Sequence, residues 1–571
     1  MPLAKFQLTI SKNQLRMKKI TLFCFVSLLL ISSCKNNDTE VTEKKVITQL
    51  SLSQTQAQLA MGDSLSLTLS YIPADLPAPT CTWTSSDPTI ATVDNKGKIK
   101  AIGRGTTTIT VATTKTDASS LVISPQCKLT VTYKGDGSVS NPYLIYTVDD
   151  LKAIRDSINT KNDVYGNKVY KLMNDLDFSK EKNNWTPIGN SLAVTFKGVF
   201  DGNGRIISNM HIGSVGTAYY YPDTIRYAGF FGTIDGAEIE NLSIAWNQII
   251  DGKSSVDYYV GGIAAYGSGT ITNCNSSGDM TGDDSKYDER CTVGGIIGYG
   301  TITTVITNCR YNSGGVSYYS NFGTPAGYAG GIAGHIIGTI SNCYSTGTTG
   351  HTIKYAGGIV GYSIGSITNC YSTNVVYPWQ PNTLSGGIAG YNVGSIVNCY
   401  SVGNINGIYS GGIAGQGSDI TNCYASGVIL GFEGSSSSTL PISYTGYAGG
   451  IAATAFGNIS NCIALNSKVS AVPESDDVSA KGYAARICGM FSASAAAKNN
   501  YAATSVVVKV NDRTNVIVTD FSDTKLHGFN LTAQPVDLLN AYVSANPTFN
   551  NIGLKKWKVT AGVNNGYPVF E

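Results

Sequence analysis

The residue with the clearest catalytic spacing in this sequence is Ser363, at the centre of a Gly-x-Ser-x-Gly pattern over 361–365. In hydrolases this pattern places a nucleophilic serine on a sharp turn between a strand and a helix. Here the pattern lies inside a repeated unit, and neighbouring units carry Ile336 or Asn392 at the equivalent position. We therefore expect Ser363 to be a repeat position and not a nucleophile.

A pair of neighbouring carboxylates, Asp283 and Asp284, has the composition that glycoside hydrolysis requires. The pair lies in a polar insertion, 279–290, which we expect to be an exposed charged loop. A β-helical polysaccharide lyase would also need a base and a charge-neutralising group, and the repeats show no local cluster of lysines, arginines or acids. We predict no catalytic residues. A carbohydrate-active enzyme, a glycan hydrolase or lyase with its acids in long corner loops, is the alternative.

Side chains that ligate metals are present but are not spaced as ligands. None of the histidines lies in an H-E-x-x-H pattern, and the 13 cysteines include no C-x-x-C pair. The four histidines are His211, His335, His351 and His527. We therefore expect no metal and no cofactor.

The composition favours stacked β structure. Glycine accounts for 64 of the 571 residues, and charged residues make up 14%, against a usual share of about 25%. The 40 basic and 38 acidic residues leave a net charge of +2, which gives no attraction to nucleic acid.

The N-terminal residues predict a secretion signal. Lys18 and Lys19 precede an apolar run, 20–31, which is shorter than the roughly 20 residues that cross a bilayer as a helix. The signal peptide is expected over 17–34, and residues 1–16 are expected to be a misassigned upstream extension.

The end of this signal, Ile-Ser-Ser-Cys at 31–34, resembles a bacterial lipobox. The resemblance implies that Cys34 becomes lipid-modified and anchors the protein in the outer membrane, exposed at the cell surface. Residues 35–45 are polar and should form a flexible tether. An ordinary secretory signal with an incidental cysteine is the alternative.

Residues 46–133 alternate between apolar and polar side chains in short runs separated by turns, which predicts an all-β sandwich. The run at 83–94, WTSSDPTIATVD, closely resembles the group 2 bacterial immunoglobulin-like domain. That resemblance implies a spacer or adhesion module of a cell-surface protein. Cys81 and Cys127 lie in this segment and are a candidate disulfide, although the sequence does not show whether they are close.

A repeated unit dominates residues 227–501. In seven units a Gly-Gly-Ile element is followed by an Asn-Cys pair, and successive cysteines lie 24 to 39 residues apart; the first unit carries Leu242 in place of the cysteine. The pairs end at Cys274, Cys309, Cys343, Cys370, Cys399, Cys423 and Cys462. The shortest unit, of 24 residues, has the length of one turn of a parallel, right-handed β-helix built from three short strands.

The Ile-x-Asn-Cys spacing predicts a bend of the backbone at the asparagine. Ile367 and Cys370 are both apolar, but residues i and i+3 of a straight strand face opposite sides. A left-handed conformation at Asn369 would turn both inward, and stacked units would align the asparagine amides in a ladder. We expect a column of buried, unligated thiols, and disulfides between neighbouring units are the main competitor.

The repeat resembles the GLUG motif of bacterial surface proteins, including non-catalytic regions of some IgA-cleaving peptidases. The resemblance extends to an entry region at 135–226 and to a C-terminal cap at 502–571. Within the entry region, 147–159 predicts a helix that starts at a Thr147 cap and plugs the first coil.

Tyrosines follow the inward cysteines and should face outward as stacked rows. The first row is Tyr344, Tyr371, Tyr400 and Tyr424. A second set, which precedes the Gly-Gly pairs, is Tyr328, Tyr355, Tyr409 and Tyr447. Such rows can stack on sugar rings or bind a protein, or they can simply cover the solenoid.

These features predict an all-β chain, with an immunoglobulin-like sandwich, a helical cap and a parallel β-helix. The expected function is that of a non-enzymatic, monomeric surface lipoprotein that is adhesin-like and binds a glycan or a host extracellular protein. A purely structural stalk is a further alternative.

Overall fold

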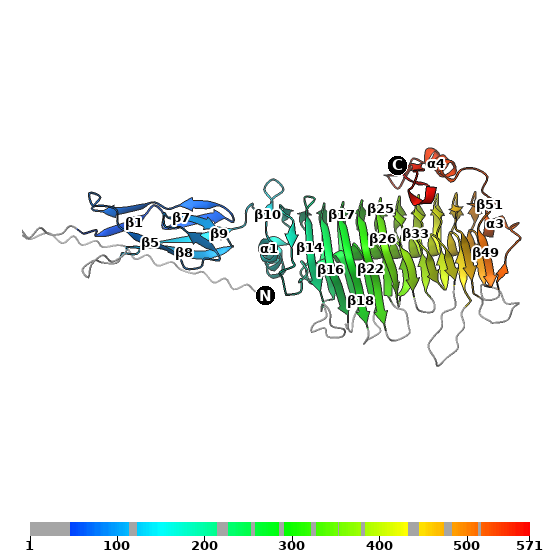
Figure 1. Cartoon of the computed structure of the whole chain (residues 1–571), viewed down its shortest axis with the longest axis horizontal. Coiled ribbons are helices and arrows are strands. Elements are labelled where there is room, and N and C mark those ends of the chain that lie inside the picture. Colours follow the sequence, from blue (N-terminus) through cyan, green and yellow to red (C-terminus); the bar gives the residue numbers. More distant parts are fainter. Residues whose placement is uncertain are drawn as a thin grey trace, which may run out of the picture.

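The structure is a computed structural model, and it describes residues 46–113, 123–213, 226–252, 257–284, 290–320, 327–351, 353–378, 383–431, 445–472, 482–511 and 515–571. The predicted signal peptide, Cys34 and the tether lie outside these residues. The chain forms a small β-sandwich followed by a long stack of parallel strands in a β-helix-like arrangement (Figure 1). The predicted fold class is confirmed. No helix among the described residues combines the length and apolar character needed to cross a membrane.

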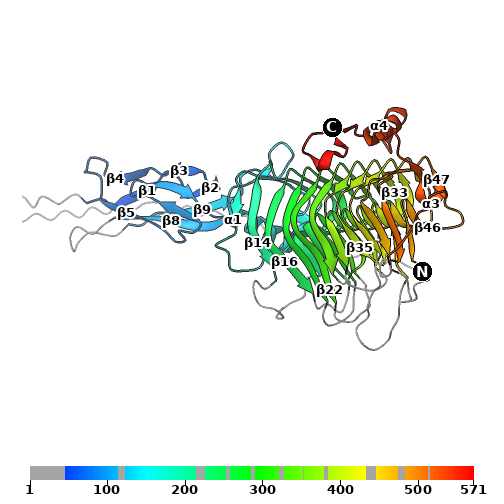
Figure 2. The same cartoon turned by 45° about the vertical axis from the view of Figure 1, so that its right-hand side comes forward.

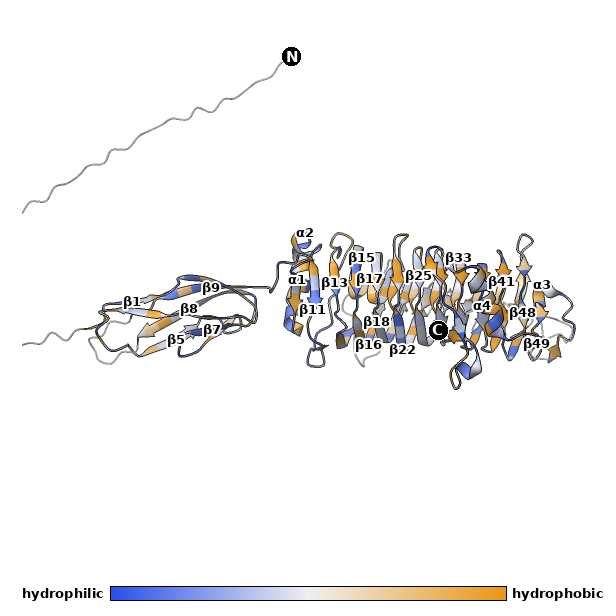
Figure 3. Cartoon of the chain, turned by 90° about the horizontal axis from the view of Figure 1, so that it is seen from above, coloured by the Kyte–Doolittle hydropathy of each residue, from blue (hydrophilic) through white to orange (hydrophobic). Residues whose placement is uncertain are grey.

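The sandwich packs its sheets around a small apolar core. Ile99, Ile109 and Leu129 are fully buried within it. One sheet has the order β2 (Gln56–Ala60), β9 (Gln126–Thr132), β8 (Gly105–Thr113) and β5 (Cys81–Ser85). The others are β3 (Ser64–Ser66), β7 (Lys98–Ala101) and β6 (Ala91–Val93), and the pair β1 (Gln49–Leu52) and β4 (Leu69–Ile72). Polar and apolar residues alternate along these strands (Figure 3).

The proposed disulfide of this domain is wrong, because Cys81 and Cys127 are both free thiols. Strand β8 lies between their strands, with Thr113 opposite Cys81 and Ile109 opposite Cys127. The cysteines are thus two strand spacings apart, roughly 9–10 Å, and are also offset along the strands. Disulfides need Cα atoms within about 7 Å.

The β-helix stacks its strands into two long sheets, one of 24 and one of 18 strands. Within these sheets nearly all neighbouring strands are parallel, and each pairs with the equivalent strand of the next coil. The predicted three strands per coil are too few, because short breaks divide each side of the coil. One complete coil consists of β27 (Ile353–Gly357), β28 (Val360–Ser363), β29 (Ser366–Thr368), β30 (Tyr371–Ser372) and β31 (Val375–Pro378). A single apolar core runs along the inside of the coils.

The predicted bend is confirmed, and the predicted amide ladder is continuous from Asn342 to Asn422 but interrupted at Asn308. Among the described residues, nine asparagines at the bends of successive coils take the left-handed conformation, with φ between 53° and 55°. They are Asn241, Asn273, Asn308, Asn342, Asn369, Asn398, Asn422, Asn461 and Asn499. The cysteine that follows each of seven of them is buried in the core and is a free thiol. The predicted column of packed thiols is therefore confirmed, and the disulfide alternative is excluded for it.

The predicted N-terminal plug is also confirmed. Helix α1 (Val148–Thr160) begins after Thr147, whose side chain accepts a hydrogen bond from the Asp150 backbone in a capping box. Leu151, Ile154 and Ile158 are buried and join the core of the coils. The helix closes the end of the solenoid that faces the sandwich (Figure 1). A short helix, α2 (Asn162–Tyr165), follows it.

The predicted charged loop at 279–290 is partly wrong. Strand β18 (Asn275–Asp284) continues through its first half, with Met280 buried in the core. Parallel neighbours on both sides, β16 (Ser243–Gly252) and β22 (Arg310–Ser320), provide hydrogen-bonding partners for this strand and extend it into the polar segment.

The C-terminal region is more than a cap at the end of the stack. The last coil is covered by β49 (Val507–Asn511), β50 (Val516–Ile517), α3 (Thr524–His527) and β51 (Phe529–Asn530). The chain then turns back along the side of the coils as α4 (Pro535–Ala545) and the strands β52 (Thr548–Phe549) to β55 (Val569–Phe570), as Figure 1 and Figure 2 both show. We call residues 535–571 the return segment. It covers a lateral face because its apolar residues, including Leu539, Val543 and Trp557, pack on outward tyrosines.

Candidate binding surfaces

The tyrosine row, Tyr344, Tyr371, Tyr400 and Tyr424, forms the predicted outward stack. Successive ring centroids lie 4.8, 4.8 and 5.1 Å apart, and the ring planes differ by no more than 8°. The rings stand on equivalent strands: β26 (Tyr344–His351), β30, β34 (Tyr400–Ser401) and β38 (Tyr424–Ala425). The rigid stack of coils therefore fixes their spacing.

Half of this row is not available as a binding face. The return segment covers Tyr400 and Tyr424, which expose only 5% and 0% of their surface. The Trp557 ring lies 5.7 Å from each of them, and Phe570 lies 5.3 Å from Tyr400. The prediction of four exposed rings is therefore wrong for these two. Trp557 and the apolar residues of α4 were the sequence signal for this covering segment. They lie outside the repeats, so the repeat pattern does not predict which tyrosines they contact.

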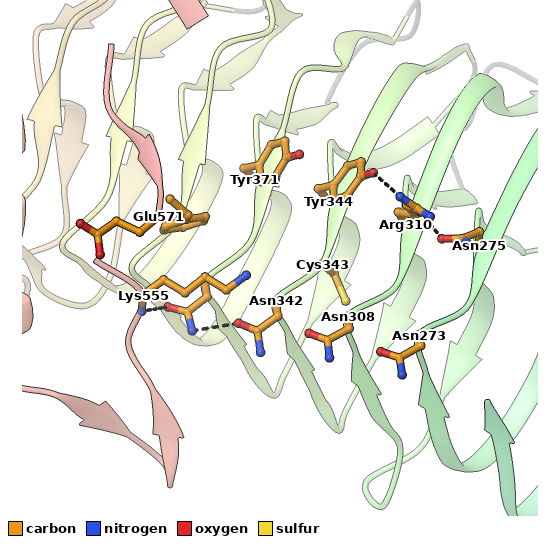
Figure 4. A pocket seen from close by; sticks show the side chains of 12 residues that line it. Asn273, Asn275, Asn308, Arg310, Asn342, Cys343, Tyr344, Tyr371, Lys555 and Glu571 are labelled. Carbon is orange, nitrogen blue, oxygen red and sulfur yellow. Dashed lines mark hydrogen bonds between the residues drawn. The ribbon is translucent and has the colours of Figure 1, made fainter. Parts of the chain in front are cut away.

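The uncovered half of the row lines a groove of about 460 Å³ (Figure 4). Tyr344 and Tyr371 form one wall, and Arg310 donates a hydrogen bond of 3.2 Å to the Tyr344 hydroxyl. The opposite side is formed by asparagines of the ladder, and Lys555 of the return segment lies at one end. Burial raises the pKa of Tyr371 to about 12, so its hydroxyl stays protonated at neutral pH.

A larger aromatic surface, which we call the terrace, lies on the 24-stranded sheet. It consists of two touching columns of rings that are half-buried, apart from one buried histidine. One column contains Tyr259, Tyr328 and Tyr355, and the other contains Tyr266, Tyr299, His335, Tyr362 and Tyr391. Ring centroids along and across the columns lie between 4.4 and 5.8 Å apart. Because the return segment lies elsewhere, no described residue of that segment covers the terrace.

Only part of the terrace was predicted from the repeat pattern. Tyr328 and Tyr355 were predicted to stack and do so, as do Tyr409 and Tyr447. The second column was missed, although its signal was present: an aromatic residue stands five positions after the first glycine of several Gly-Gly-Ile elements.

The first column is interrupted at Thr292, and a hollow of about 380 Å³ opens there. Tyr259 and Tyr328 flank it, and Asp257 and Arg290 lie at its edge, 3.9 Å apart. The carboxylate of Asp257 raises the pKa of Arg290, and the two opposite charges lie together at this edge. The hollow thus offers ring faces for stacking and a few polar groups for orientation, as small-ligand sites do.

His335 replaces a tyrosine within the second column. Its ring lies 4.4 Å from Tyr299 and 4.6 Å from Tyr362, and its Nε2 has no hydrogen-bond partner among the described residues. Burial, assisted by the nearby positive charge of Arg290, lowers the pKa of His335 to about 4. The imidazole is therefore neutral at physiological pH and acts as another aromatic ring.

The candidate nucleophile is buried in the repeat. Ser363 has no exposed surface and its hydroxyl donates to the Gly365 carbonyl at 3.3 Å. Across the described ranges, no cluster of three or more histidine, cysteine, aspartate or glutamate side chains could hold a metal ion.

Curated relatives match only parts of the chain. It is 29% identical over 227 residues to halomucin of Haloquadratum walsbyi, which covers 38% of this chain and 2% of that protein. It is 45% identical over 64 residues to a 3-O-alpha-D-galactosyl-alpha-L-arabinofuranosidase of Bifidobacterium longum subsp. longum, which covers 11% of this chain and 6% of that enzyme. The chain therefore spans a small fraction of the length of these relatives.

A solved structure of a candidate immunoglobulin A1 protease from Bacteroides ovatus aligns with 76% of this chain and 94% of its own, at 19% identity and a TM-score of 0.34. The family models are more specific. Residues 46–123 match the bacterial Ig-like domain (group 2), and residues 325–349 and 354–377 match the GLUG motif. The sandwich is thus a group 2 bacterial Ig-like domain, and the β-helix that follows contains GLUG repeats.

Proposed function

We propose that this protein is a non-enzymatic surface lipoprotein that binds glycans through the terrace. The observation that carries the proposal is the pair of touching aromatic columns, whose rings are stacked at close to the coil spacing and remain open to solvent. Both domain types are of the kind found in surface proteins, which fits a role in adhesion to a glycan-bearing surface.

The physical fit of the terrace to a sugar chain has two parts. A sugar ring has an apolar face formed by its C–H groups, and this face stacks on the flat faces of tyrosine rings while the tyrosine hydroxyls accept or donate hydrogen bonds. The rings of the terrace are also held in place by the coils beneath them, so little side-chain entropy is lost on binding. A polymer with a regular repeat can contact several rings at once.

The proposal is tested with purified protein on a glycan array, followed by titration of the best soluble ligand. Tyr299→Ala and Tyr355→Ala, each of which removes a ring that lines the hollow, should each weaken binding roughly tenfold, which corresponds to the loss of one stacking contact. Tyr344→Ala, in the tyrosine row, is the matched control and should leave glycan affinity unchanged.

Two results would contradict this function. If Tyr344→Ala weakened glycan binding as much as Tyr355→Ala, the terrace would not be the site. If the same polysaccharides were depolymerised during incubation with the wild-type chain, the protein would be an enzyme.

The proposed anchor is tested separately at Cys34, because the thioether bond to lipid has no other attachment point. Cys34→Ser should remove the label introduced by a metabolic fatty-acid probe and release the protein from the membrane fraction. Each buried CH₂ of an acyl chain contributes about 0.8 kcal/mol to membrane binding, so loss of the acyl chains should release the protein from the membrane. Equal labelling of wild type and Cys34→Ser would rule the anchor out.

A further inference from the structure

The return segment shows what the asparagine ladder can bind. Asn369 donates from Nδ2 to the Gly553 carbonyl at 2.8 Å, and its Oδ1 accepts from the Lys555 backbone N–H at 3.0 Å. The next amide, of Asn398, donates to the Lys555 carbonyl at 2.9 Å. A carbonyl and an N–H two residues apart on one extended chain therefore meet one side-chain amide, which is how a residue of a parallel strand meets its neighbour.

The same contact includes an aromatic anchor. The Trp557 indole N–H donates to Asn398 Oδ1 at 2.8 Å, and its ring lies against Tyr400 and Tyr424. The Tyr424 hydroxyl in turn donates to the Pro568 carbonyl. The covered half of the face thus binds backbone groups through asparagine and an aromatic side chain through tyrosine, and the backbone contacts do not depend on a particular peptide sequence.

The uncovered half of the tyrosine row lies beside ladder asparagines that have no peptide bound to them in the described part of the chain. The ladder is continuous beneath the return segment, with amide-to-amide bonds of 3.1, 2.7 and 2.7 Å from Asn342 to Asn422. Among the described residues, Asn308 makes no side-chain hydrogen bond, and Asn342 uses only its oxygen, which accepts from Asn369. Both amides line the groove beside Tyr344 (Figure 4).

The charges around the groove favour an acidic ligand. Arg310 and Lys555 lie toward its two ends, and neither pairs with an acid within the described part of the chain (Figure 4). Glu571 also lines the groove and makes no ion pair with either cation. Glu571 lies toward the Lys555 end, so the uncompensated positive charge is at the Arg310 end of the groove (Figure 4).

We propose that the uncovered half of this face binds an extended, acidic polypeptide strand of another protein. The strand's backbone pairs with the amides of Asn308 and Asn342, one aromatic side chain stacks on Tyr344, and an acidic side chain lies near Arg310. This site is separate from the terrace, so the protein holds a peptide on one face and presents its aromatic columns on another.

The test uses a fluorescein-labelled peptide, Gly-Leu-Glu-Glu-Trp-Glu, which copies residues 553–558 with each lysine replaced by glutamate. Fluorescence anisotropy with the full chain should show saturable binding. The double variant Asn308→Gly/Asn342→Gly should weaken it roughly tenfold or more, since two amide hydrogen bonds are lost. Glycine keeps the left-handed backbone at both positions, so thermal unfolding should confirm that the variant folds.

Three control ligands make the outcome specific. A backbone N-methylated peptide should not bind, the lysine-containing original should bind more weakly than the glutamate form, and the sugar cellohexaose should not compete. Binding that survives N-methylation or the double glycine variant would overturn the proposal. Tighter binding of the lysine peptide, together with dimers of the chain in sedimentation, would show instead that a second copy's return segment is the ligand. Competition by cellohexaose would assign the groove to sugars.

Discussion

The two aromatic faces of this solenoid are made by the same repeats but differ in what covers them. The terrace is open along five coils, from Tyr259 to Tyr391. The tyrosine row is open at Tyr344 and sealed at Tyr424 by a segment that belongs to no repeat. The comparison shows that a repeat unit determines where rings stack, while sequence outside the repeat determines which rings a ligand can reach.

The largest expected effect is on the apolar core of the coils, which lies beneath both the terrace and the tyrosine row. Cys370→Asp buries a carboxylate in the apolar core and should cost roughly 5 kcal/mol of folding free energy. Cys370→Ala removes one small buried group and should cost about 1–2 kcal/mol. Thermal unfolding of each variant measures the difference.

Thiol labelling is the independent check on that interior. Complete burial raises the pKa of Cys274 and Cys309, two thiols of this column, so both are protonated and shielded in the folded chain. If Cys370 reacted freely before denaturation, or if Cys370→Asp unfolded like wild type, the column would not be packed inward.

Much of this architecture was predictable, because repeats supply many independent copies of each local rule. The left-handed Asn369, the inward Cys370 and the capping box at Thr147 each follow from a local conformational preference. The position of the return segment did not follow, because the contact between Trp557 and Tyr424 joins residues more than a hundred positions apart. The predicted disulfide between Cys81 and Cys127 was wrong for a similar reason. Strand β8 lies between their strands in the sheet, and the order of strands in a sheet does not follow from local sequence patterns.

The second expected effect separates the covered half of the row from the open half. Tyr424→Ala removes a fully buried ring that contacts Trp557, and should cost about 3–5 kcal/mol. The return segment should also become sensitive to limited proteolysis near residues 545–556, while the terrace keeps its glycan affinity. Unchanged proteolysis would show that α4 and Trp557 hold the segment without the row.

The third prediction concerns pH and is specific to the terrace. The folded pKa of His335 lies at about 4, below the usual 6.5, so the unfolded chain takes up this proton first. The contribution of neutral His335 to the free energy of unfolding is complete above pH 6.5, and it is lost progressively as the pH falls to about 4. Its full size is on the order of 3 kcal/mol.

Chemical denaturation at pH 7, 5.5 and 4.5 measures this loss, and His335→Tyr is the matched control because tyrosine occupies this position in the neighbouring coils. The variant should lose less stability between pH 7 and pH 4.5 than wild type. Identical pH profiles would show that His335 is not the group responsible.

The smallest expected effect compares one open ring from each face. Tyr344→Ala and Tyr355→Ala each remove a partly exposed ring that stacks on neighbours, and each should cost only about 0.5–1.5 kcal/mol. The two costs should be similar because neither ring lies under the return segment, so the faces would differ in their cover and not in their stacking. Equilibrium denaturation of both variants, beside Tyr424→Ala, gives the comparison directly. A cost for Tyr344→Ala as large as that for Tyr424→Ala would mean that stacking along the row, rather than the return segment, stabilises the covered tyrosines.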